Sequence, residues 1–273
     1  MQTAEQTDHT TTNPVFGFTI LGSGSNGNAT VIHGPEGNIL LDAGFSRKEL
    51  ERRMRQRNIE PSGIKALLLT HEHTDHVQGC RVFADHYNCP VYLTAGTENK
   101  LPCKNCVPAQ RILIESGAVF QLCGLRIEAF SIPHDVEEAV AYTFHCGNKK
   151  LGYATDLGMT GMMVLNRLQA CNALVLESNY EPSLLQASGR PLPLKRRIMS
   201  RHGHLSNAAA LEAAEQLLHD AMSHIVFAHL STECNDENKV YDGLCHLLQN
   251  CQRHHHICPQ VAKQHEPLDT VWL

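Results

Sequence analysis

HEHTDH, residues 71–76, places three histidines and one aspartate within six positions of the chain. It follows residues 64–70, a nearly all-apolar run that predicts a strand buried on both faces. Two histidines at i and i+2 after such a strand can converge on one ion, and Asp75 and His76 can turn toward a second. Imidazole and carboxylate are ligands that zinc, manganese and iron accept. The stretch therefore predicts a metal site rather than a solvated polar loop.

Acidic residues and histidines also follow four other predicted strands. Any one of them alone would be interpreted as a strand-end cap or a surface turn. Because four occur beside the histidine-rich stretch, and loops on a rigid scaffold carry functional residues, we expect one shared site. The four are Asp42 after the apolar residues 39–41, His134 after 132–133, Asp156 after 152–155, and His229 after 225–228.

Strand and helix patterns alternate along the whole chain. Strands are expected at 15–21, 29–33, 38–42, 64–70, 173–177 and 224–228, with a β-meander over 118–153. Helices are expected at 47–57, capped by Ser46, and at 77–87, 161–168, 206–219 and 236–250. No internal repeat or linker is visible. The sequence predicts an α/β fold with a two-layer sheet core, one domain over 15–273 and a flexible tail over 1–14.

Composition excludes several classes of protein. The 273 residues are 42% hydrophobic and carry a net charge of −5, which argues against a globally basic nucleic-acid binder. No apolar run is long enough to span a membrane, and the polar start does not resemble a signal peptide, so we expect a cytoplasmic protein. Eleven cysteines, an odd number, favour reduced thiols. The pair Cys103 and Cys106 would bind a structural zinc only with two further ligands.

Five motifs in order resemble the signatures of the metallo-β-lactamase superfamily: LLDAG (40–44), THEHTDH (70–76), SIPHD (131–135), YATDLG (153–158) and FAHLS (227–231). The resemblance extends from about residue 15 to the end. It implies a four-layer αββα sandwich with two mixed sheets, outer helices and two divalent metal ions at one edge. It assigns the first ion to His71, His73 and His134, the second to Asp75, His76 and His229, and a bridging role to Asp156. Asp42 resembles the carboxylate that orients a ligand histidine.

Two positions distinguish branches of this superfamily. The redox branch usually has glutamate at the position of His73, so the histidine favours hydrolysis. The zinc-dependent lactamases typically have cysteine near the position of Asp156, so an antibiotic-degrading role is disfavoured. Two adjacent ions would activate a shared water near neutral pH. The ligands suit zinc, manganese or iron. The substrate cannot be identified from the fold or from the metal ions alone.

Three segments bear on the substrate. The turn GSGSNGN (22–28) can present N–H groups and the side chains of Ser23, Ser25, Asn26 and Asn28 to an anion, although a tight strand turn explains it equally well. Residues 182–203 contain Lys195, Arg196 and Arg197 and no acidic residue, which suits either phosphate contacts or a solvated loop. The helix at 47–57 has six basic and two acidic residues and is similarly ambiguous.

Glu177 and His204 resemble the glutamate–histidine couple of tRNA 3′-processing endonucleases, where the histidine protonates the leaving oxygen. A polar residue before a helix is the alternative interpretation of His204, and His202 is close enough to be the active partner instead. With Asp75, which is also an expected metal ligand, Glu177 and His204 are the candidate catalytic residues.

The motifs GSGSNGN, LLDAG, HEHTDH, ESNY, LKRRI, GHLSN and HLS together most resemble the YycJ/WalJ exonuclease group. That likeness implies 5′→3′ exonuclease action, with DNA favoured over RNA. One departure is Thr232-Glu233-Cys234-Asn235, where the group commonly has a Lys-Glu-Asn-Asn-like segment. The alternative function is hydrolysis of small phosphodiesters or of thioesters, as in glyoxalase II. A non-enzymatic binding module would be marked by lost ligands, and none of the set is missing.

Overall fold

The computed structural model describes residues 16–101, 107–251 and 255–273. Its first sheet has seven strands in the order β14-β1-β2-β3-β4-β5-β6. Pairing is antiparallel from β14 to β3 and parallel from β3 to β6, so the sheet is mixed. The strands are β1 (Gly17–Gly22), β2 (Ala29–Gly34), β3 (Gly37–Leu41), β4 (Ile64–Leu68), β5 (Val91–Thr94), β6 (Arg111–Ile114) and β14 (Val271–Trp272).

The second sheet also has seven strands, in the order β13-β12-β11-β10-β9-β8-β7. Strands β7 to β10 pair antiparallel, which confirms the meander expected over 118–153. Strands β10 to β13 pair parallel, so this sheet is mixed as well. The strands are β7 (Val119–Leu122), β8 (Leu125–Ser131), β9 (Val140–Cys146), β10 (Lys149–Ala154), β11 (Ala173–Glu177), β12 (His224–Ala228) and β13 (Cys258–Val261).

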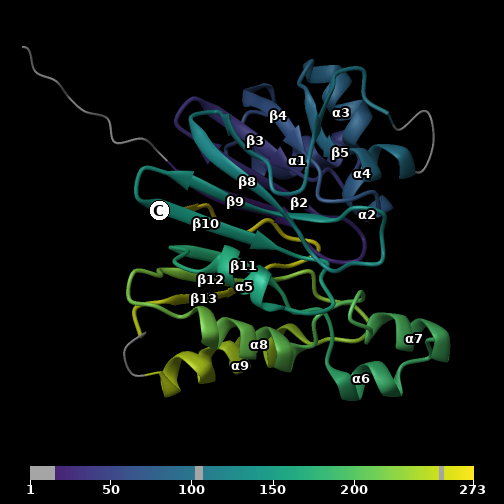
Figure 1. Ribbon diagram of the computed structural model, residues 1–273, viewed down its shortest axis with the longest axis vertical. Coiled ribbons are helices and arrows are strands. Elements are labelled where there is room, and N and C mark those ends of the chain that lie inside the picture. The colour runs from purple at the N-terminus through teal and green to yellow at the C-terminus, as the bar shows by residue number, and fades with distance from the viewer. Residues whose placement is uncertain (1–15, 102–106, 252–254) are drawn as a thin grey trace, which may run out of the picture.

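Helices cover the outer faces of the two packed sheets, which confirms the αββα architecture (Figure 1). α1 (Arg47–Gln56) and α3 (Cys80–Tyr87) pack on the first sheet, and α5 (Met162–Leu168), α8 (Asn207–Leu217) and α9 (Glu237–Asn250) on the second. Each of these helix layers packs on its sheet through an apolar cluster, and a further apolar cluster, with Leu41, Tyr142 and Val226, lies between the two sheets. The remaining helices are η1 (Pro61–Gly63), α2 (Thr74–Val77), α4 (Ala95–Lys100), α6 (Pro182–Ala187) and α7 (Leu192–Ile198).

Helix starts follow the capping residues in the sequence. The hydroxyl of Ser46 accepts a hydrogen bond from the backbone N of Glu49 at the start of α1, as expected. Ser206 and Asp236 cap α8 and α9 in the same way. These side chains satisfy N–H groups that have no partner within the helix, so they fix where each helix begins. Strand β11 is buried at all five positions; its first four residues are apolar, as is typical of a strand buried on both faces, and the fifth is Glu177.

The helix expected over 77–87 is present as α3, but it begins at Cys80, three residues later than predicted. The chain forms α2 and α3 with a break at Gln78 and Gly79, because this point lies against the loop after β3. The backbone N of Gly79 donates to Ala43 O at 2.7 Å, and a Cβ here would lie 2.0 Å from Phe45 O. The close approach requires glycine.

Several elements were not expected from the sequence. Residues 182–203 contain α6 and α7, each with a proline in its first turn, a position that favours helix starts. Strands β5, β6, β13 and β14 and helix α4 were also not anticipated. The expected tail 1–14 and the pair Cys103 and Cys106 lie outside the described residues. The single-domain assignment stays a prediction. Over the described ranges, no helix combines the length and apolar character needed to cross a membrane.

Candidate metal centre

The loops that follow the strands bring the seven expected metal ligands together. His71 and His73 follow β4, and Asp75 and His76 lie in the adjoining helix α2. His134 follows β8, Asp156 follows β10 and His229 follows β12. Their ligand atoms form overlapping groups in which all atoms lie within 4.8 Å of one another. Residues from both sheets thus meet at one edge of the sandwich.

The first group consists of His71, His73 and His134. Nε2 of His71 lies 3.0 Å from Nδ1 of His73, and Nε2 of His134 lies 3.3 Å from the same atom. Burial, and then the neighbouring histidines, hold the pKa of His71 well below its ordinary value. Burial likewise lowers the pKa of His73 and His134. The three imidazoles are therefore held neutral, which is the form that binds a metal ion.

The second group consists of Asp75, His76 and His229. Oδ2 of Asp75 lies 3.6 Å from Nε2 of His76 and 3.5 Å from Nε2 of His229. Burial alone would lower the pKa of His76, but the carboxylates of Asp156, Asp42 and Asp75 raise it to about 9. Burial would also lower the pKa of His229, but the carboxylates of Asp156, Asp75 and Glu177 raise it well above its ordinary value. This half of the centre carries concentrated negative charge.

Asp156 connects the two groups. Its Oδ2 lies 3.3 Å from Nε2 of His76, its Oδ1 lies 3.3 Å from Nε2 of His229, and it also groups with His71. Oδ2 of Asp156 and Nε2 of His229 are buried without a hydrogen-bond partner among the residues described. Leaving buried polar atoms unpaired is costly. A cation would satisfy both atoms, so this donor set fits divalent metal ions.

Hydrogen bonds from outside the cluster orient its imidazoles. Oδ2 of Asp42 lies 2.8 Å from Nδ1 of His76, and Asp42 also accepts from the backbone N of Thr70 at 2.9 Å. This contact turns Nε2 of His76 toward Asp75 and Asp156. In the same way, Nδ1 of His134 lies 3.2 Å from Gly203 O, which leaves its Nε2 facing the first group. Such partners fix the tautomer and the ring orientation of a ligand histidine.

Three residues of the centre have left-handed backbone conformations. The φ angles are 57° at Asp42, 61° at Asp156 and 56° at His229. Asp42 and His229 directly follow a strand and Asp156 comes two residues after one, and the unusual angle turns the chain sharply near the strand end. Residues other than glycine rarely adopt the left-handed backbone region, and each one that does costs roughly 1–3 kcal/mol. The fold therefore concentrates backbone strain where these side chains are positioned.

Glu177, fully buried at the end of β11, anchors the region beside the cluster. Its Oε1 lies 2.9 Å from Nδ1 of His204 and 2.8 Å from Nδ1 of His229. Burial would raise the pKa of Glu177, but contact with these two imidazoles holds it well below its ordinary value. The carboxylate also accepts from the backbone N atoms of Asp156, Leu157 and Leu205. Glu177 thus positions a metal-ligand candidate as well as His204, a role not anticipated from the sequence.

His204 lies beside the cluster with part of its side chain accessible. Its ring stacks on His229 at a centroid distance of 5.3 Å, and its side chain is 20% exposed. Burial would lower the pKa of His204, but the carboxylate of Glu177 raises it. Because Nδ1 contacts Glu177, Nε2 is the atom left to act on a substrate. His202 is exposed and has no such carboxylate contact among the residues described.

The turn at residues 22–28 divides into two pairs of side chains. The hydroxyl of Ser23 accepts from the backbone N of His229 at 2.9 Å and donates to Asn28. Nδ2 of Asn28 lies 3.0 Å from Nε2 of His76 and 3.2 Å from Oδ2 of Asp75. Both side chains are buried against the cluster, whereas Ser25 and Asn26 are exposed. Ser25 and Asn26 are therefore better placed to contact a substrate than the buried Ser23 and Asn28.

Two supporting residues were missed by sequence reasoning. Nδ2 of Asn179 donates to His229 O at 2.7 Å, which supports the strained turn after β12. Thr70 donates its hydroxyl to Asp42 and lies 3.0 Å from Nδ1 of His71. Asn179 lies within the motif ESNY (177–180) and Thr70 is the first residue of THEHTDH (70–76), although neither was singled out as a site residue. Membership in these motifs was the signal in the sequence that could have identified them.

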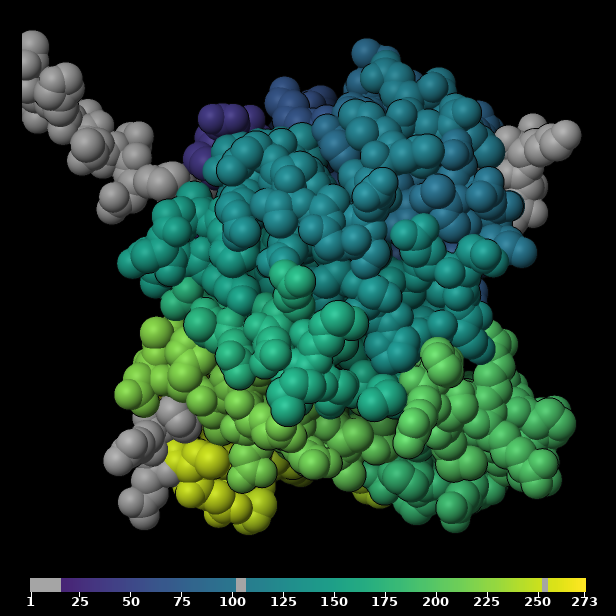
Figure 2. All heavy atoms as spheres, in the orientation of Figure 1, coloured from purple at the N-terminus to yellow at the C-terminus, as the bar shows by residue number. Residues whose placement is uncertain are grey.

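The basic segment forms a projecting corner of the molecule that includes α6 and α7 (Figure 1 and Figure 2). Lys195 donates to the carbonyls of Gln186 and Ser188 and so holds the end of α6. Arg197 pairs with Asp135, the residue after His134, and so links α7 to the metal cluster. Arg196 is exposed and pairs with no acidic residue that the structure describes. Of the three basic side chains expected to contact substrate, Arg196 is the one left free.

Metal binding is expected to release protons near neutral pH. His76, with its pKa raised to about 9, is protonated in the metal-free protein, and its proton must leave before Nε2 can bind an ion. Metal affinity should therefore rise as the pH increases toward about 9 and fall under acidic conditions. Calorimetric titration with zinc in two buffers of different ionisation enthalpy measures the released protons. Identical heats in both buffers would contradict the expectation, and His76→Ala should release fewer protons than the unaltered chain.

Comparison with known proteins identifies relatives over most of the chain. A family model described as a beta-lactamase superfamily domain matches residues 37–229. The exodeoxyribonuclease YycJ of Bacillus anthracis is 34% identical over 220 residues, covering 80% of this chain and 83% of that protein. The exodeoxyribonuclease WalJ of Streptococcus pneumoniae is 30% identical over 224 residues, covering 81% and 83%. The crystal structure of the metallo-beta-lactamase fold protein YhfI from Bacillus subtilis superposes with a TM-score of 0.69 at 14% identity, covering 93% of this chain and 99% of that one.

Proposed function

This chain belongs to the β-lactamase superfamily, and from that membership and the geometry of its site we propose that it cleaves phosphodiester bonds in nucleic acid. As a member it is a metal-dependent hydrolase. The single observation that carries the proposal is the cluster of ligand atoms at the sandwich edge, which the ion pair between Asp135 and Arg197 connects to the basic helix α7. We further propose DNA as the substrate and 5′→3′ removal of nucleotides, because the YycJ and WalJ relatives are named exodeoxyribonucleases.

Two ions are proposed, because the ligand atoms form two groups of three, and Asp156 lies close to His71 of one group and to His76 and His229 of the other. His71, His73 and His134 would hold one ion, and Asp75, His76 and His229 the other. Zinc, manganese and iron all suit these nitrogen and oxygen atoms. When bound, the pair supplies an activated water near neutral pH and an electrophile for the phosphate oxygens. The side chain of Asp75 is 23% exposed, so its carboxylate can also orient the attacking water at the site entrance.

His204 is proposed as the general acid. Glu177 holds Nδ1 of His204 at 2.9 Å, which leaves Nε2 free to donate a proton. A proton delivered to the leaving oxygen removes the cost of expelling an alkoxide. Glu177 itself is fully buried, so it acts through His204 and His229 rather than on the substrate. Arg196 would contact a phosphate group outside the cluster, as would Ser25 or Asn26 of the turn after β1.

Degradation of end-labelled DNA by the purified chain tests the proposal. Single- and double-stranded DNA and RNA of one sequence, labelled at either end, are incubated with manganese or zinc. We expect stepwise loss of nucleotides from the 5′ end that chelation abolishes. Arg196→Glu should raise KM about fivefold at low salt and flatten the salt dependence, because phosphate contacts of this kind are ionic.

Arg126→Glu is the matched control for Arg196→Glu. Arg126 is exposed near the start of β8, at the opposite end of the strand from His134, so its reversal should leave KM unchanged. Turnover of glutathione thioesters or small phosphodiesters without any DNA or RNA degradation would overturn the nuclease proposal. That result would favour the small-molecule hydrolase instead.

A further inference from the structure

We propose that a cavity beside His134 binds an unpaired nucleobase at the end of the nucleic acid being cut, an inference that rests on the proposed function. The cavity has a volume of about 410 Å³, within the range of sites that hold small ligands. His134 lines it and also belongs to the first metal-ligand group. A group in the cavity therefore lies directly beside the proposed point of cleavage.

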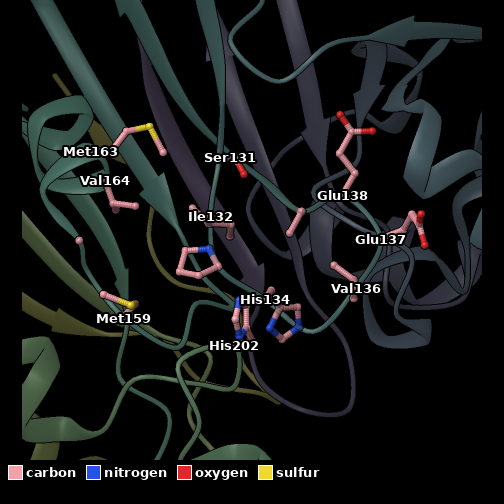
Figure 3. Close-up of a pocket in the computed structure, with 13 residues that line it drawn as sticks. Ser131, Ile132, His134, Val136, Glu137, Glu138, Met159, Met163, Val164 and His202 are labelled. Carbon is pink, nitrogen blue, oxygen red and sulfur yellow. The ribbon is translucent and has the colours of Figure 1, made fainter.

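The walls of the cavity suit a flat apolar ring. Ile132, Val136, Val164, Met159 and Met163 line it together with the imidazoles of His134 and His202. Figure 3 shows Met159, Met163 and Val164 on one side of the two histidines and Val136 on the other. Met159 is 39% and Met163 61% exposed, so both side chains have surface available for a ligand. Flexible, polarizable methionines pack well against aromatic rings.

Charge around the cavity argues for a base rather than a phosphate. Glu137 and Glu138 line it, and no lysine or arginine is found among its described lining residues. An anionic phosphate would be repelled here, whereas the neutral base can donate its ring N–H or amino groups to carboxylates. The positively charged side chains near the site lie outside the cavity, on α7. There Arg197 pairs with Asp135, and Arg196 has no acidic partner among the described residues. The terminal nucleotide would thus place its base toward α5 while the backbone phosphates follow α7.

A base in this cavity cannot remain stacked and paired in a duplex. Enzymes that take a base out of the stack act most readily on nucleotides that are mismatched or already single-stranded. The structure therefore assigns a preference to the site: single-stranded, mismatched or frayed ends are cut faster than ends closed by stable pairs. The preference does not require recognition of one particular base, because an apolar wall contacts the face of every base.

Paired substrates and paired variants test the inference. Two DNA strands are compared with manganese, one normal and one carrying an abasic site at the terminal nucleotide with its phosphates intact. Met163→Ala should raise KM for the normal strand about fivefold and leave the abasic strand unaffected, and Met163→Leu should restore binding. Met162→Ala is the control, because Met162 neighbours Met163 on α5, is 75% exposed and is not among the cavity-lining residues.

A second measurement does not depend on turnover. DNA with 2-aminopurine at the terminal position is titrated with protein in EDTA, and its emission should rise when the base leaves the stack, less so with Met163→Ala. Equal cutting of normal and abasic strands, with Met163→Ala matching Met162→Ala, would overturn the base site while the nuclease proposal stands. No cutting of any strand by the unaltered chain would overturn the nuclease proposal and this inference with it.

Discussion

Replacing Asp156 by asparagine is expected to abolish metal-dependent hydrolysis while the fold is retained. The carboxylate lies 3.3 Å from His76 and 3.3 Å from His229 in the second group and also groups with His71 of the first, and the amide removes its charge and one acceptor oxygen. Asparagine tolerates the left-handed conformation at this position, φ 61°, better than alanine does. The loss therefore reports on the site and not on backbone strain.

The measured effect should be a fall in kcat/KM of about three orders of magnitude or more, which corresponds to about 4 kcal/mol of transition-state stabilisation. Metal content by elemental analysis should fall as well. His73→Ala should behave alike, since it removes one of three nitrogens from the first group. Asp242→Asn, an exposed position on α9, is the control and should retain full activity. Undiminished turnover by Asp156→Asn with a normal metal content would place the site elsewhere.

The family and the architecture were predictable because their signals are local. HEHTDH directly follows an apolar strand, and His134, Asp156 and His229 each follow another, so the topology of a sandwich brings them together. The resemblance to the metallo-β-lactamase superfamily and to its YycJ/WalJ group is confirmed by the matches to these proteins. The two mixed sheets with outer helices are confirmed as well.

The supporting contacts were not predictable because they join distant parts of the chain. Ser23 contacts the backbone of His229, 206 residues away, and Asn28 reaches His76, 48 residues away. Local patterns made both look equally suited to a substrate anion. The break at Gly79 depends on the loop near Ala43, which no periodicity in residues 77–87 reveals. Such details follow from packing between layers, and sequence patterns describe each layer separately.

Glu177→Gln is expected to impair both stability and activity, because every polar contact that the structure shows for Glu177 is made by a donor. Three backbone N–H groups and two imidazoles converge on the carboxylate. A glutamine amide would direct its own N–H groups at some of these donors inside a fully buried site. We expect about 3 kcal/mol lower free energy of unfolding and about 100-fold lower kcat/KM. Unchanged thermal unfolding would contradict the anchoring role.

His204→Ala separates proton donation from positioning. It removes one contact of Glu177 but leaves the hydrogen bond to His229 and the three backbone contacts, so the unfolding temperature should change little. Loss of a general acid lowers the rate roughly 10²–10⁴-fold when the leaving group needs a proton. DNA has such a leaving group, whereas a p-nitrophenyl ester of a nucleotide releases a stable anion without protonation.

The contrast between substrates decides the role of His204. With His204 as the general acid, the variant His204→Ala should lose most of its activity on DNA and little on the p-nitrophenyl ester. Glu177→Gln should lose activity on both substrates, because His229 is displaced as well. Equal losses on both substrates for His204→Ala would make it a positioning residue only. His202→Ala, tested beside it, should retain activity on the ester and on strands lacking the terminal base. A loss on DNA that follows His202 instead of His204, spares the ester and persists on strands lacking the terminal base would transfer proton donation to His202.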